Sequence, residues 1–208
     1  MRRCVAVGFL VLVVLCGNAG AVEFGADLGT RAATLWPAGY YGYPGAVRGG
    51  AFDLLADVPL SKVFSVNFRP GGFTSTDKWK ADDGTTPAVN LFALDARVAL
   101  FASVPIVKDA VTAYAGVGAT FDWVRYWNVN VTDLPFQRVV RTGVTVGVPA
   151  GLKLRLSRCI TACLEMEVPD QGWYHDVIEE NSAAERKLDW SQYGSVEPSV
   201  CAAVYLAH

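Results

Sequence analysis

Residues 140–156 alternate between apolar side chains and side chains that are small or charged. The charged residues of this stretch, Arg141, Lys153 and Arg155, all occupy odd-numbered positions, whereas its valines and leucines occupy even-numbered ones. A β-strand turns successive side chains to opposite faces, so the stretch has one apolar face and one polar face. Strands in soluble domains usually have about five or six residues, but a tilted strand needs about 9–11 residues to cross a bilayer. The stretch therefore predicts a membrane-spanning strand.

Seven further segments repeat the alternation, and no part of the chain shows a sustained helical period. They are residues 22–32, 52–58, 63–69, 91–102, 111–123, 160–168 and 196–206. Together with residues 140–156 they predict an all-β fold of about eight strands.

The predicted connections differ in length in a regular way. Short turns fall near residues 59–62, 105–109 and 157–159, whereas long polar connections fall at residues 34–46, 74–90, 126–138 and 169–190. All six tryptophans lie in or beside the long connections. Short turns at one end, long loops at the other and an aromatic girdle are typical of outer-membrane barrels. We therefore expect an eight-stranded antiparallel up-and-down transmembrane β-barrel.

Alternation alone does not say which face is inside, and a soluble lipocalin-like barrel would turn its apolar face inward. The charged face is also rich in glycine, for example at Gly116, Gly118, Gly143, Gly147 and Gly151. An eight-stranded barrel has an interior barely wide enough for side chains, so small residues belong there. This favours a charged lumen and a lipid-facing apolar surface.

The first 21 residues predict a secretory signal peptide, which leaves residues 22–208 as the barrel domain. Arg2 and Arg3 precede an apolar core, and residues 19–21 (Ala-Gly-Ala) supply a small-residue cleavage site. Cys16 raises the alternative of a lipoprotein, but Leu15 stands where a small residue is expected. The predicted location is the bacterial outer membrane, with the long loops outside the cell.

Nothing in the sequence predicts catalysis, a cofactor or a metal site. The two histidines, His175 and His208, have no serine or cysteine partner at a recognisable spacing. Cys159 and Cys163 lack the further ligands that a zinc site needs. The net charge of −2 gives no electrostatic reason to expect nucleic acid as a partner. We expect a protein that is not an enzyme.

Charges of both signs share the predicted lumenal face. The expected lumenal charge network comprises Asp95, Arg97, Asp122, Arg141, Lys153, Arg155, Glu165 and Glu167. Buried charges are tolerated when they are partnered, so we expect pairing across the lumen. The alternative is that these charges line a narrow polar path.

Two smaller features concern the lumenal face. Leu91, Val124 and Val139 lie near the long-loop ends of their strands and predict an apolar lumenal pocket. Cys163 and Cys201 lie on the last two predicted strands. A disulfide between them and two free thiols both remain open, because the outcome depends on the strand register.

The chain resembles the OmpW-type group within the superfamily of small outer-membrane β-barrels. The resemblance rests on residues 114–119 (YAGVGA), residues 143–147 (GVTVG) and residues 197–200 (EPSV), which open the last predicted strand. It implies an eight-stranded barrel with an apolar extracellular pocket, and passage of small hydrophobic molecules into or across the outer membrane. His208 departs from the pattern, because such barrels usually end in an aromatic residue that the assembly machinery reads.

Two functions fit this scaffold, and the fold alone does not separate them. The first is a narrow porin or channel for small hydrophobic solutes. The second is a non-conducting surface protein whose long loops bind a host or partner molecule. The expected partners are outer-membrane lipid, the outer-membrane assembly machinery, and either a small hydrophobic solute or a host ligand.

Overall fold

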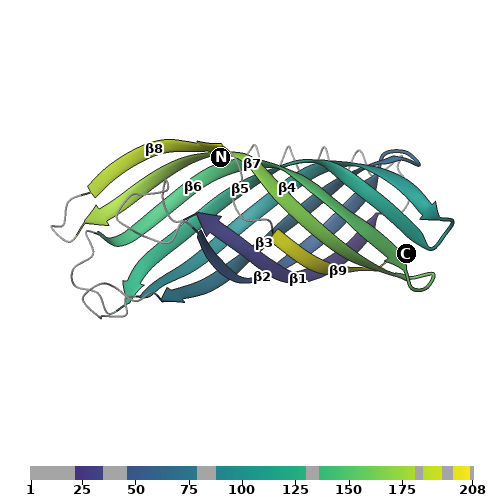
Figure 1. Cartoon of the computed structure of the whole chain (residues 1–208), viewed down its shortest axis with the longest axis horizontal. Coiled ribbons are helices and arrows are strands. Elements are labelled where there is room, and N and C mark those ends of the chain that lie inside the picture. Colours follow the sequence, from purple (N-terminus) through teal and green to yellow (C-terminus); the bar gives the residue numbers. More distant parts are fainter. Residues whose placement is uncertain are drawn as a thin grey trace.

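A computed structural model describes residues 22–34, 46–78, 88–129, 136–180, 185–193 and 199–206 (Figure 1). The predicted signal peptide, Trp36, Trp79, Glu197 and His208 lie outside these ranges. Among the described residues, no helix has the length and apolar character that a membrane-spanning helix requires. The strands are β1 (Glu23–Thr34), β2 (Ala46–Pro59), β3 (Phe64–Lys78), β4 (Ala88–Val107), β5 (Val111–Val129), β6 (Phe136–Arg155), β7 (Ile160–Glu180), β8 (Glu185–Tyr193) and β9 (Ser199–Leu206).

The strands form a closed antiparallel up-and-down barrel, which confirms the predicted fold class. Each strand from β1 to β7 pairs with the next along the chain. The second edge of β7 pairs with β9 near the start of β7 and with β8 nearer its end. These two short strands therefore share the place of a single barrel strand, and β9 closes the barrel by pairing with β1.

The predicted short turns are confirmed. They lie between β2 and β3, between β4 and β5, and between β6 and β7, and all three are at one end of the barrel (Figure 1). In the second of these turns Asp109 has a φ of 59°. Aspartate tolerates this left-handed conformation better than most residues do, because its short side chain can bond locally to the backbone.

The predicted long connection at residues 169–190 is wrong over most of its length. β7 continues to Glu180 and forms a hairpin with β8 that projects at the other end of the barrel (Figure 1). A β-bulge explains the error: Gly147 pairs with Pro169 and Val146 with Gln171, so Asp170 has no partner on β6. An extra residue reverses the alternation, and the strand no longer looks continuous in the sequence.

The outward and inward faces are those that the glycines predicted. Outward apolar side chains are exposed, with Leu28 at 68%, whereas inward charged side chains are buried, with Arg97 at 2%. Trp123 and Trp173 lie on the outer surface near the long-loop end. Lipid is the solvent that suits an exposed surface of this kind.

Gly151 shows why the lumenal face needs small residues. It lies opposite Tyr114 on the neighbouring strand, and the Tyr114 ring covers it. A Cβ at position 151 would lie 2.6 Å from the Tyr114 hydroxyl oxygen and 2.4 Å from the Leu164 carbonyl oxygen. The second of these atoms is backbone and cannot rotate away.

We predict that Gly151→Val lowers the free energy of unfolding by about 1–3 kcal/mol, because overpacking displaces neighbours in a close-packed interior. Ala115→Val is the matched control, since Ala115 is exposed on the outer face of β5. Its effect should stay within about 0.5 kcal/mol. Urea unfolding of the refolded barrel in detergent micelles measures both values, and equal midpoints for the two variants would contradict this packing.

Candidate functional site

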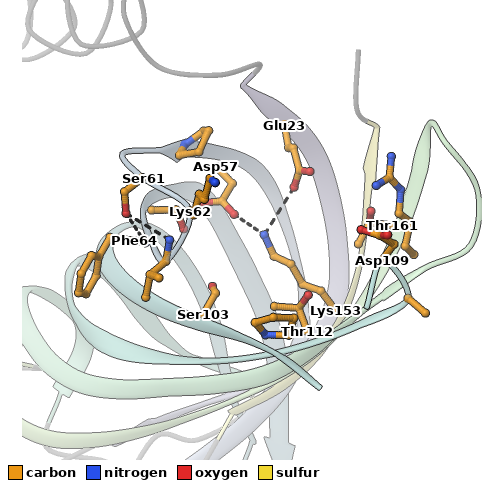
Figure 2. Close-up of a pocket in the computed structure, with 16 residues that line it drawn as sticks. Glu23, Asp57, Ser61, Lys62, Phe64, Ser103, Asp109, Thr112, Lys153 and Thr161 are labelled. Carbon is orange, nitrogen blue, oxygen red and sulfur yellow. Dashed lines mark hydrogen bonds and ion pairs between the residues drawn. The ribbon is translucent and has the colours of Figure 1, made fainter. Parts of the chain in front are cut away.

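The lumen at the short-turn end opens into a polar cavity of about 380 Å³. Lys153 projects into it from β6 and forms ion pairs with Asp57 of β2 and Glu23 of β1 (Figure 2). Arg155 also lines the cavity, but it is exposed and donates to the backbone carbonyls of Ser157 and Arg158. The predicted placement of Arg155 in the lumenal network is therefore corrected. It lies at the very end of β6, beyond the acidic side chains of the neighbouring strands.

Further into the barrel, an apolar and aromatic cluster fills the lumen. Its members are Leu55, Ala99, Phe101, Tyr114, Cys163, Ala203 and Tyr205. The rings of Phe101 and Tyr114 meet edge to face with their centroids 4.8 Å apart. The Tyr114 hydroxyl donates to Glu165 at 2.9 Å, which links this cluster to the charged residues of the mid-lumen.

Four aspartates lie along one row of paired positions in the mid-lumen. Asp27 pairs with Asp53, Asp53 with Gly71, Gly71 with Asp95, and Asp95 with Asp122. Gly71 leaves room for its neighbour, because a Cβ there would lie 1.6 Å from an Asp53 carboxylate oxygen. Asp122 accepts a hydrogen bond from the Thr145 hydroxyl at 3.1 Å.

Arg69 and Arg31 neutralise much of this acidic row. The Arg69 guanidinium lies 2.5 Å from Asp27, donates to Asp53 at 2.8 Å, and reaches Glu165 across the lumen at 2.6 Å. Arg31 forms ion pairs with Asp53 and Asp95. These contacts join side chains from five strands, so the mid-lumen is a single connected ion-pair network.

Arg97 extends the network toward β7. Its guanidinium donates to Glu165 at 2.6 Å, to Glu167 at 2.8 Å and to Asn67 at 3.3 Å, and it lies 5.8 Å from the centre of the Phe101 ring. The predicted pairing of Arg97 with acidic residues across the lumen is present.

A second charged pair lies in the long-loop half. Arg141 donates to both carboxylate oxygens of Asp176, at 2.7 and 2.9 Å, and to the Tyr126 hydroxyl at 3.1 Å. The guanidinium also lies over the Tyr126 and Tyr174 rings. A bidentate arginine–carboxylate pair of this kind is among the stronger polar contacts in proteins.

Apolar side chains surround this pair, and they include the predicted pocket residues. Leu91 pairs with Tyr126, Tyr126 with Val139, and Val139 with Ile178. Val124 lies opposite Arg141. All of these side chains are buried, so the structure brings Leu91, Val124 and Val139 into one inward-facing patch at the long-loop end.

The charge network expected from the sequence omitted Arg69 and Asp53, which the structure places at its centre. It also omitted Asp176, which pairs with Arg141 in the long-loop half. Arg69 and Asp53 lie on the polar faces of their predicted strands, but each of those strands was expected to be only seven residues long. Asp176 lies beyond the bulge in β7, within residues that were expected to form a loop. A restart of the alternation after Gly172 was the signal that could have identified it.

In the structure Cys163 and Cys201 are free thiols. Cys163 pairs with Ala203, and Cys201 pairs with Glu165. The two cysteines share a face but are two positions out of step, so their side chains do not lie directly opposite one another.

An exposed apolar outer belt around a closed barrel with a charged, packed lumen defines a small transmembrane β-barrel. Among solved structures, the fold is similar to the outer membrane protein OprG from Pseudomonas aeruginosa, with a TM-score of 0.53 and 10% identity over 92% of this chain and 95% of that one. It is also similar to a major outer membrane protein from Thermus thermophilus, with a TM-score of 0.51 and 13% identity over 91% of this chain and 100% of that one. No protein-family model matches the sequence, and no curated protein matches it. The likeness therefore concerns the fold.

We predict that Arg97→Met destabilises the barrel by about 3–5 kcal/mol, because it leaves the buried Glu165 and the half-buried Glu167 with fewer partners. Arg155→Met should change the free energy of unfolding by less than about 0.5 kcal/mol, because Arg155 is exposed. Adding Glu165→Gln to Arg97→Met should recover part of the loss. Urea unfolding in micelles tests all three variants, and additive losses in the double variant would argue against direct coupling.

Thiol labelling should separate the three described cysteines into two groups. In the folded barrel only Cys159 should react quickly, because it is exposed, whereas Cys163 and Cys201 are buried. After unfolding, all three should react whether or not reductant was added. Mass spectrometry of the labelled peptides identifies each site, and labelling of Cys163 and Cys201 that requires reductant would reveal a disulfide.

Proposed function

We propose that this protein carries small apolar solutes through the long-loop half of its barrel into the outer membrane, without conducting ions or polar solutes. The observation that supports this is the inward apolar patch of Leu91, Val124, Val139 and Ile178. An apolar solute gains about 25 cal/mol for each Å² of surface that it removes from water there.

The ion-pair network sets the direction of travel in this proposal. A solute that continued straight down the lumen would have to separate Arg69 and Arg97 from Glu165, which would leave buried charges without partners. Release sideways into lipid avoids that cost. The proposal takes residues 1–21 as the export signal, the assembly machinery as a transient partner, and the long connections as extracellular.

The second candidate is a surface protein that binds a host or partner molecule. It is favoured by the length of β7, whose 21 residues exceed the 9–11 or so that a bilayer requires. The β7–β8 hairpin carries exposed polar side chains on its outer face, including His175, Lys187 and Asp189. A projecting wall of this kind offers a binding surface without any passage.

Uptake into liposomes tests the first candidate. Residues 22–208, refolded into liposomes, should speed the uptake of a small apolar dye relative to empty liposomes and leave potassium flux unchanged. Val139→Thr should slow dye uptake about tenfold, because a buried hydroxyl without a partner costs about 1–3 kcal/mol. Val117→Thr, on the lipid-facing side of β5, is the matched control.

The outcomes separate the two candidates. Dye uptake no faster than in empty liposomes would exclude passage and favour surface binding. Potassium flux through the refolded barrel would show instead that the lumenal network opens.

A further inference from the structure

A groove of about 720 Å³ crosses the outer wall of the barrel over strands β5 to β8, on the side of the wall away from the lumenal network. Its lining residues are Phe121, Thr142, Gly143, Val144, Trp173, Tyr174, His175, Asp189 and Ser191. Phe121 and Trp173 are large and exposed, at 57% and 46%.

Differences in side-chain size along one row create the groove. Phe121 pairs with Val144, and Val144 pairs with Trp173. Two bulky rings therefore stand on either side of a small side chain, on strands about 9–10 Å apart. Thr142 and Gly143 continue the low floor toward the long-loop end.

The two ends of the groove differ in chemistry. At one end Phe121, Val144 and Trp173 belong to the apolar belt that faces lipid. At the other end lie the Thr142 hydroxyl and the His175–Asp189 pair, whose Nδ1 and Oδ1 atoms are 2.5 Å apart. Ser191 pairs with Trp173 and lies level with the apolar end. The groove thus continues the lipid interface across its boundary with water.

We propose that this groove binds one outer-leaflet glycolipid, with an acyl chain between Phe121 and Trp173 and a sugar headgroup at Thr142, His175 and Asp189. Carboxylate, imidazole and hydroxyl groups together can donate to and accept from sugar hydroxyls. A phosphate headgroup fits less well, because Asp189 repels it and His175 is the only basic residue among the described lining residues. The Trp173 ring can cover the face of a sugar at the interface.

Two amphiphiles that share one brominated alkyl chain test this proposal, one with a maltose headgroup and one with phosphocholine. Bromine quenches nearby tryptophans, Trp123 included, so the part of the quenching that disappears in Trp173→Phe reports the occupancy of the groove. The barrel, refolded in phosphocholine micelles, should show saturable quenching by the maltoside at concentrations at least fivefold below those that the phosphocholine amphiphile needs.

Substitutions test the acyl-chain part and the sugar part of the site separately. Val144→Phe should fill the groove and weaken maltoside quenching at least fivefold, whereas Val117→Phe, on the same outer face, should not. Asp189→Ala should reduce the preference for maltose over phosphocholine, with Lys187→Ala as the exposed control on the same strand. Val144→Leu serves if Val144→Phe does not fold, as judged by the gel shift between unheated and boiled samples.

Equal quenching in Val144→Phe and Val117→Phe would show that the amphiphile contacts the barrel only as non-specific surrounding lipid. That result would overturn the proposed site. Equal affinity for the two headgroups would overturn the sugar assignment. Neither result depends on solute passage, so this site and the proposed function can fail separately.

Discussion

The ion pairs around Glu165 hold the two sides of the lumen together. Glu165 projects from β7, and Arg69 and Arg97 reach it from β3 and β4 on the far side of the barrel. In a lipid-surrounded barrel a charge has only the lumen in which to find a partner, because the outer belt offers no water or counter-charge. The narrow interior of an eight-stranded barrel brings those partners within reach. Closure of the barrel, ion pairing in the lumen and the difference in polarity between the two faces therefore follow from one constraint: a charge can find a partner only inside the lumen.

That constraint explains why the fold could be predicted from the sequence. Alternation identified the strands, and the glycines on the charged face distinguished a packed lumen from a water-facing surface. The failure came at residues 169–180, where one unpaired residue, Asp170, reverses the alternation. A pattern of period two loses its phase at a bulge, so the predicted strand ended where the real strand continues. The prediction therefore assigned to a loop three residues beyond the bulge whose side chains face the lumen: Tyr174, Asp176 and Ile178.

The odd or even position of a residue in a strand predicts which face its side chain occupies, but it does not predict which side chain it contacts. Arg155 and Lys153 share a face on β6. Among the acidic side chains that the structure describes, Lys153 forms ion pairs and Arg155 forms none, because Arg155 lies at the last position of the strand. Arg69 was left out of the expected charge network for a related reason. It lies at the end of the predicted strand, whereas the real strand runs on to Lys78. Cys163 and Cys201 share a face too, and only the register shows that they are out of step. Side-chain pairing across a barrel depends on stagger, which the sequence of a single strand does not contain.

Among the described residues, the barrel wall has the fewest strand pairings at the long-loop end, where the proposed passage requires it to open. Within the described residues, β8 pairs only with β7, and positions 31–34 of β1 pair only with β2. The mid-lumen, by contrast, is bounded by strands paired on both edges and by arginines that link opposite walls. Regions with fewer pairings open at lower free energy than the global unfolding transition. In the proposed function, movement at the long-loop end would admit or release a solute while the ion-pair network below it stays closed. Passage into lipid would then not require the lumen to conduct.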